Sequence, residues 1–87
     1  MGDYKLILSR SVEHDVRKIG KATLGRILQA IRDLSKDPFP KGCRKLKGAE
    51  SSYRIRIGDY RVLYEVDSTE RLVSVLHIRH RKDAYRE

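Results

Sequence analysis

Residues 53–61 read Tyr-Arg-Ile-Arg-Ile-Gly-Asp-Tyr-Arg, a pattern typical of a β-hairpin that carries positive charge on one side. Successive side chains of a strand point to opposite faces. The first strand therefore has an apolar and a basic face: Tyr53, Ile55 and Ile57 against Arg54 and Arg56. Glycine comes first in the pair Gly58-Asp59, as it does in a type II′ hairpin turn. The sequence thus predicts a tight hairpin at this point.

The strand that returns from this turn continues the same division. Over residues 60–66 the alternation again gives two faces: Tyr60, Val62, Tyr64 and Val66 against Arg61, Leu63 and Glu65. If the apolar faces align, Arg54, Arg56 and Arg61 share the opposite surface. Like charges at close range destabilise a sheet, so we expect this surface to bind an anion. A nucleic-acid backbone is the anion that fits best.

Two helices are predicted upstream of the hairpin. Residues 4–8 are an apolar-rich run that predicts a first strand. A helix follows, with Ser9 or Ser11 as its N-cap and Gly20 at its end. The next helix has an apolar stripe with helical spacing: Leu24, Ile27, Leu28, Ile31 and Leu34. Pro38 ends it, because the residue before a proline avoids the helical conformation.

The remaining segments complete an α+β fold in a single domain over residues 1–87. Residues 44–47 are expected to form a short strand, residues 71–79 a longer one, and residues 80–87 a charged tail. Strict alternation gives the longer strand two faces: Leu72, Ser74, Leu76 and Ile78 against Arg71, Val73, Val75, His77 and Arg79. The order β-α-α-β-β-β predicts a mostly antiparallel sheet with a helical hairpin on one face. The other face stays open, with a predicted apolar floor and basic rim: Leu63, Val73 and Val75, then Arg54, Arg56, Arg61 and Arg79.

Composition favours a polyanionic partner. The 87 residues include 20 Lys+Arg against 12 Asp+Glu, a net charge of +8. A chain of this length buries one modest core, so a site should be a groove or a sheet face. The single Cys43 forms no internal disulfide, which suits a reducing compartment. With no run long enough to span a membrane and no apolar leader, we expect a cytoplasmic protein without membrane contact.

Four segments occur in an informative order: Lys45-Leu-Lys-Gly48, Tyr53-Arg-Ile-Arg-Ile57, Asp59-Tyr-Arg-Val-Leu-Tyr64 and His77-Ile-Arg-His-Arg-Lys-Asp-Ala-Tyr85. Together they resemble the RelE family of toxins, within the RelE/ParE toxin–antitoxin superfamily. The resemblance covers nearly the whole chain. Its RNase branch consists of mRNA interferases, metal-independent endonucleases without a cofactor that cut mRNA in the ribosomal A site and inhibit translation. The 2′-hydroxyl attacks the adjacent phosphate and leaves a 2′,3′-cyclic phosphate. The resemblance also implies a cognate acidic antitoxin that forms a hetero-oligomer with the toxin.

The resemblance implies a catalytic set of four arginines and one tyrosine: Arg54, Arg56, Arg61, Arg79 and Tyr85. Arg61 falls at a phosphate-stabilising arginine, and Arg79 at a position implicated in transition-state stabilisation and leaving-group protonation. Tyr85 falls at a tyrosine that stacks on or orients the substrate. The predicted RNA-binding residues are other basic or imidazole side chains nearby: Lys45, Lys47, His77, His80, Arg81 and Lys82. No metal ligand is predicted.

One departure from the family leaves the proton acceptor open. Arg54 and Arg56 fall where the best-studied members carry two lysines. A crowded lysine can lose its proton, whereas arginine in effect cannot, so these residues suit electrostatic stabilisation and not proton transfer. The candidate bases are His77, if it shares the open face, His80, an ionised Tyr85 or a ribosomal group.

Three other functions compete with the endonuclease. A ParE-like protein would inhibit DNA gyrase, but that class lacks the full cationic set. A non-catalytic RNA-binding domain would need exposed aromatic side chains on its sheet, whereas the hairpin tyrosines alternate to the apolar face. A structural module without activity would bind only its partner.

Overall fold

The computed structural model describes residues 3–46, 48 and 50–84 and confirms the α+β class. The strands are β1 (Lys5–Leu8), β2 (Arg44–Lys45), β3 (Ser52–Ile57), β4 (Tyr60–Asp67) and β5 (Leu72–His80). The helices are α1 (Arg10–Asp15), the short 3-10 helix η1 (Val16–Lys18), α2 (Lys21–Leu34) and α3 (Arg81–Ala84). Part of the segment predicted as a plain tail is thus the short helix α3.

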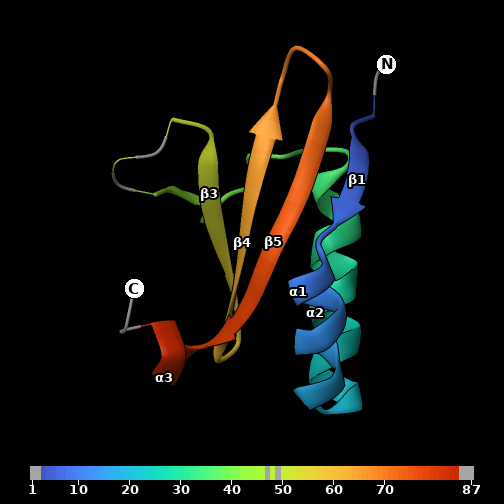
Figure 1. The fold of residues 1–87 in the computed structure, drawn as a ribbon, viewed down its shortest axis with the longest axis vertical. Coiled ribbons are helices and arrows are strands. Elements are labelled where there is room, and N and C mark those ends of the chain that lie inside the picture. Colours follow the sequence, from blue (N-terminus) through green and yellow to red (C-terminus); the bar gives the residue numbers. More distant parts are fainter. Residues whose placement is uncertain (1–2, 47, 49, 85–87) are drawn as a thin grey trace.

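Within the described residues the strands form one sheet in the order β1-β5-β4-β3-β2 (Figure 1). β1 runs parallel to β5, and the other neighbouring strands are antiparallel, as the prediction of a mostly antiparallel sheet requires. Figure 1 shows α1 and α2 side by side, next to the β1–β5 side of the sheet. Because β5 lies between β1 and β4, residues from both ends of the chain meet at this strand.

Both helices begin where the sequence predicts, but the first α-helix ends at Asp15 and continues toward Gly20 as the 3-10 helix η1. Ser9 is the N-cap of α1, and its hydroxyl accepts a hydrogen bond from the Val12 N–H at 3.3 Å. Gly20 is the N-cap of α2 and separates it from η1. The predicted stripe of α2 faces the core, where three of its members are buried: Ile27, Ile31 and Leu34.

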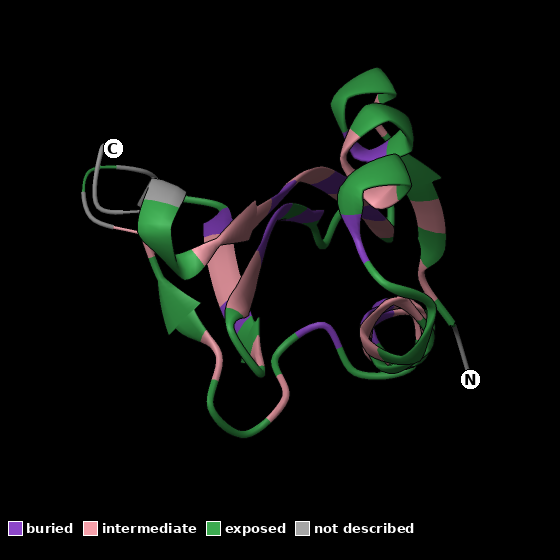
Figure 2. Ribbon diagram, turned by 90° about the horizontal axis from the view of Figure 1, so that it is seen from below, coloured by how far each residue is buried: buried purple, intermediate pink, exposed green. Residues whose placement is uncertain are grey.

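A single apolar core lies between the helices and one face of the sheet. Its fully buried members come from α1, α2, β4 and β5: Val12, Ile27, Leu34, Val62, Tyr64, Val73 and Val75. The Tyr64 hydroxyl donates to the Pro38 carbonyl at 2.7 Å, and its ring stacks on Tyr53 with centroids 5.9 Å apart. Burial raises the pKa of Tyr64. Figure 2 shows the buried positions along the strands and the adjoining helices, whereas the β3–β4 and β4–β5 turns and the described part of α3 are exposed.

A β-bulge in β5 corrects one predicted pattern. Leu63 pairs with His77 but Tyr64 pairs with Val75, so Leu76 is an extra residue without a partner in β4. Before the bulge, Val73 and Val75 point into the core and are 0% exposed, not on the open face as predicted. After the bulge, the buried Ile78 points into the core, and His77 and Arg79 take the open face as predicted.

Strand boundaries also differ from the prediction by one or two residues. β2 stops at Lys45, two residues earlier than expected, and β5 begins at Leu72, one residue later. Arg71 has a φ of 56°, a left-handed conformation that places it in the turn and not in the strand. Its carbonyl accepts the Lys5 N–H at 2.8 Å, which aligns β1 beside β5. No helix in the described part of the chain has the length and apolarity to cross a membrane.

A candidate nucleic-acid interface on the open sheet face

Three arginines lie in one row across the open face. Arg61 of β4 pairs with Arg56 of β3 on one side and with Arg79 of β5 on the other. Directly opposite residues of neighbouring strands project from the same face, with Cβ atoms about 4.5–5.5 Å apart. The turn predicted at Gly58 sets this register, and the glycine has the positive φ, 60°, that a type II′ turn needs at its first central position.

A second row lies beside the first, toward the centre of the sheet. It runs from Arg44 of β2 through Arg54 and Leu63 to His77 of β5. Leu63 is 9% exposed and forms the apolar floor of the face, as predicted, although Val73 and Val75 do not. Burial, together with the positive charges of Arg61, Arg56 and Arg44, lowers the pKa of the Arg54 guanidinium. We call these two rows, which are Arg44, Arg54, Arg56, Arg61, Leu63, His77 and Arg79, the basic face.

Arg81 extends the basic face at the hairpin turn. The N–H of Arg81 donates to the Asp59 carbonyl at 2.7 Å, so α3 begins directly against the turn. A hollow of about 150 Å³ lies there, and Arg56, Arg61 and Arg81 all line it. A second hollow, of about 430 Å³, lies at the β2–β3 side and is lined by Arg44, Arg54 and Arg56. The guanidinium groups therefore border concave surfaces that an anion can enter.

Not every predicted residue joins this surface. Lys45 pairs with Tyr53, which packs against the core, so its register places it on the opposite face from Arg54. His80 pairs with Tyr60, and their rings meet edge to face with centroids 5.1 Å apart. His80 Nδ1 also accepts the Lys82 N–H at 3.2 Å. Lys82 is exposed on α3. The predicted residues Lys47 and Tyr85 lie outside the described residues.

Arg44 is a member of the basic face that the sequence prediction missed. The sequence predicts a strand over residues 44–47, and alternation alone does not say which face of the sheet Arg44 takes. Alternation gave a usable signal, because adjacent residues in a strand point to opposite sides and Arg44 must then oppose Lys45. The register with β3 was the missing information, and it places Arg44 directly opposite Arg54.

The strand that carries His77 and Arg79 is held by α1. β1 covers the edge of β5 only as far as the Leu8–Val75 pair. Beyond it, the Ser9 hydroxyl donates to the Leu76 carbonyl at 2.7 Å, and Asp15 Oδ2 accepts the Ile78 N–H at 3.0 Å. These bonds satisfy an otherwise free strand edge and fix the bulge in place. They thereby position the two functional candidates of β5.

The chemistry that this surface offers is stabilisation of negative charge. Guanidinium groups keep their charge and donate in a planar fork that matches phosphate oxygens. Within residues 3–46, 48 and 50–84, no three His, Cys, Asp or Glu side chains gather as a metal site would need. His77 adds an imidazole to the arginines of the basic face, with ring nitrogens that can donate or accept a hydrogen bond.

Comparison with known proteins identifies the family of this chain. Residues 6–85 match the family described as ParE toxin of type II toxin-antitoxin system, parDE. A Methanocaldococcus jannaschii protein assigned as the toxin RelE1 is 29% identical over 86 residues, covering 95% of this chain and 96% of the relative. Toxin RelG of Mycobacterium tuberculosis is 29% identical over 84 residues, covering 95% and 97%.

A solved structure agrees with these relatives. A chain of the archaeal RelE–RelB complex from Pyrococcus horikoshii superposes with a TM-score of 0.82 at 28% identity, covering 91% of this chain and 96% of that one. The chain therefore belongs to the RelE family of toxins, within the RelE/ParE superfamily of type II toxin–antitoxin systems.

Proposed function

We propose that this toxin is a ribosome-dependent mRNA endonuclease that acts through the basic face. The observation that carries the proposal is the row Arg56–Arg61–Arg79, which crosses three strands in register. RNA presents phosphates in series, and guanidinium groups aligned across neighbouring strands match such a series. The cytoplasm, where translation occurs, is the corresponding location.

The proposed reaction needs no group beyond those of RNA, the ribosome and this chain. The 2′-oxygen forms a bond to the adjacent phosphorus while the bond from phosphorus to the 5′-oxygen breaks. The products are a 2′,3′-cyclic phosphate and a 5′-hydroxyl, so the proton that the 2′-hydroxyl loses is balanced by the proton that the departing 5′-oxygen gains. Negative charge gathers on the phosphoryl oxygens in the transition state, where preorganised donors give the largest effect. Arg61, at the centre of the row, and Arg54 and Arg79 beside it are the proposed donors.

We propose His77 as the acceptor of the 2′-hydroxyl proton. The β-bulge brings it to the same face as Arg54, which lies in the same row, and Arg79, two residues along β5. His80 is the weaker candidate because it lies on the face of Tyr60, away from the arginines. An imidazole can take up a proton that arginine cannot. The His77→Gln variant should cleave much more slowly and lose the acidic limb of the pH–rate profile, where protonation of the base lowers the rate, whereas His80→Gln should keep both.

An antitoxin is the proposed protein partner. The similar archaeal structure is a RelE–RelB complex, and the basic face of this chain is complementary to an acidic segment. We propose that the antitoxin neutralises the toxin by covering the basic face. The inactive form of the toxin is then a toxin–antitoxin hetero-oligomer.

The decisive experiment is induction of the toxin followed by mapping of transcript ends in a translating extract. Cleavage confined to ribosome-occupied mRNA, with 2′,3′-cyclic phosphate ends, is the expected result. Arg61→Gln and Arg79→Gln should abolish both cleavage and toxicity. The matched control is Arg26→Gln, which removes an exposed arginine of α2 outside the basic face. Cells that remain equally inhibited by the Arg61 and Arg79 variants would refute the proposal.

A gyrase inhibitor is the second candidate, because the matched family description names the ParE toxin. The same induction experiment separates the two functions. Intact mRNA together with linearised DNA or blocked supercoiling would indicate gyrase. The in-register arginine row favours RNA, since phosphate stabilisation is what its geometry provides.

A further inference from the structure

A second cationic surface lies beside the basic face, at the end of β5. A groove of about 650 Å³ runs between α1–η1 and the last residues of β5. Its lining includes three cationic side chains, Arg10, Lys18 and Arg79, and one carboxylate, Asp15. The chain has three histidines, and all of them line this groove: His14, His77 and His80.

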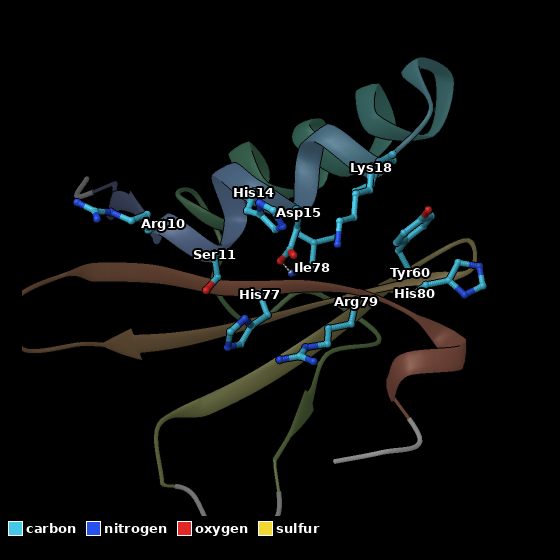
Figure 3. A pocket seen from close by; sticks show the side chains of 11 residues that line it. Arg10, Ser11, His14, Asp15, Lys18, Tyr60, His77, Ile78, Arg79 and His80 are labelled. Carbon is cyan, nitrogen blue, oxygen red and sulfur yellow. Dashed lines mark hydrogen bonds between the residues drawn. The ribbon is translucent and has the colours of Figure 1, made fainter.

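Packing explains only part of this lining. Asp15 holds the edge of β5 through the Ile78 N–H at 3.0 Å, and this accounts for the carboxylate. Arg10 and Lys18 are exposed, and their charges are not needed to cover the core. Figure 3 shows the Lys18 side chain extending from η1 toward β5. His14 lies beside Asp15, on the α1 side of β5 (Figure 3). The cationic side chains thus surround a hollow whose carboxylate is already engaged.

The groove is continuous with the basic face. His77 and Arg79 belong to the basic face by strand register, and both also line the groove. Figure 3 shows these two side chains on the far side of β5 from the α1 residues, so the groove wraps round the edge of the strand. A single flexible polyanion can therefore contact both surfaces at once.

We infer that this groove binds the phosphates of single-stranded RNA next to the scissile one, so that the strand turns round the edge of β5. The inference rests on the proposed function, because it takes the basic face as the site of the scissile phosphate. Single-stranded RNA suits the lining, which interleaves cations with the rings of Tyr60, His77 and His80. Arg10 and Lys18 contact flanking phosphates and hold the strand without taking part in bond breaking.

The test compares binding of two uncleavable 2′-O-methyl RNAs, a trinucleotide and a decamer, to the full-length toxin by fluorescence anisotropy. The Arg10→Ala/Lys18→Ala variant should bind the decamer about tenfold more weakly, with a salt dependence shallower by about 1.4 in log–log slope. Its affinity for the trinucleotide should be unchanged. The control Arg26→Ala/Lys36→Ala removes the same charge from exposed positions elsewhere and should bind both as the wild type does.

Each other outcome overturns the inference in a recognisable way. If the groove variant and the control variant bind the decamer with equal affinity and equal salt slope, RNA binding by the groove is refuted. The proposed function of the basic face is not affected by that result. A groove variant that loses affinity only for the purified antitoxin would show that the groove binds protein. A wild-type toxin that binds neither oligomer would remove the proposed RNA function together with the groove.

Discussion

Replacing Arg54 with methionine should make the protein more stable and less active. The Arg54 guanidinium is partly buried, and Arg61, Arg56 and Arg44 lie close enough to lower its pKa. A cation whose pKa is lower in the folded than in the unfolded state opposes folding at every pH below that value. At neutral pH the charge is therefore a cost to the fold. Methionine keeps an unbranched apolar stem over Leu63 and removes the charge.

The size of the gain follows from the neighbours. Like charges directly opposite each other in a sheet cost roughly 0.2–1 kcal/mol per pair, and Arg44 is directly opposite Arg54. Arg56 and Arg61 are more distant neighbours on an open face, so each contributes at the low end of that range. The sum is about 1 kcal/mol, which corresponds to a rise in Tm of about 4–8 °C for a domain of this size.

Activity should change in the opposite direction. Loss of one donor to a developing oxyanion typically lowers kcat by about 10²–10³. The assays are thermal unfolding by circular dichroism and single-turnover cleavage of ribosome-bound mRNA. Arg26→Met serves as the control and should change neither value. A variant that unfolds at a lower temperature, or that cleaves as fast as the wild type, would contradict the reasoning.

Three further predictions concern the scaffold. Tyr64→Phe leaves the buried Pro38 carbonyl unpaired and should cost about 1–3 kcal/mol in urea unfolding. Because burial raises the folded-state pKa of Tyr64, wild-type stability should fall as the pH rises above about 10, and Tyr64→Phe should lack this part of the loss. Asp15→Ala removes the acceptor of the Ile78 N–H and should cost about 1.5–3 kcal/mol, whereas Asp15→Asn, which keeps an oxygen, should cost less; equal losses would contradict the bond. Deletion of Leu76 should leave a regular β4–β5 ladder with His77 still on the open face, and should cost about 0.5–1.5 kcal/mol because the bond from the Ser9 hydroxyl to the Leu76 carbonyl is lost; an unchanged urea midpoint would contradict the role of this bond.

Local patterns were sufficient to predict the hairpin and the helices. The alternation in residues 53–57 and the turn at Gly58 specify pairing between neighbours in sequence, so the register of Arg56 with Arg61 needed no distant contact. The caps and the apolar stripe of α2 are likewise local. These features could be predicted because the interactions that determine them join residues close together in the sequence.

The faces of β5 depended on contacts that the sequence does not reveal. Residues 72–78 contain apolar side chains in both alternating sets, so periodicity cannot choose the buried one. The helices select Val73 and Val75, and the bulge then restores Ile78 to the core. His80 is different, because the predicted strand ends at Arg79; the extension of β5 to His80 is what places it on the opposite face from Arg79.

The bulge links the stability of the fold to the proposed function. β5 must bury Val75 and Ile78, which lie three residues apart, and must also present His77 and Arg79 beside Arg61. A regular strand cannot do both, because residues an odd number apart project from opposite faces. One extra residue removes the conflict, and α1 anchors it through the Leu76 carbonyl. The same feature that completes the core therefore completes the basic face, so changes in α1 that loosen this anchor should impair RNA cleavage without touching an arginine.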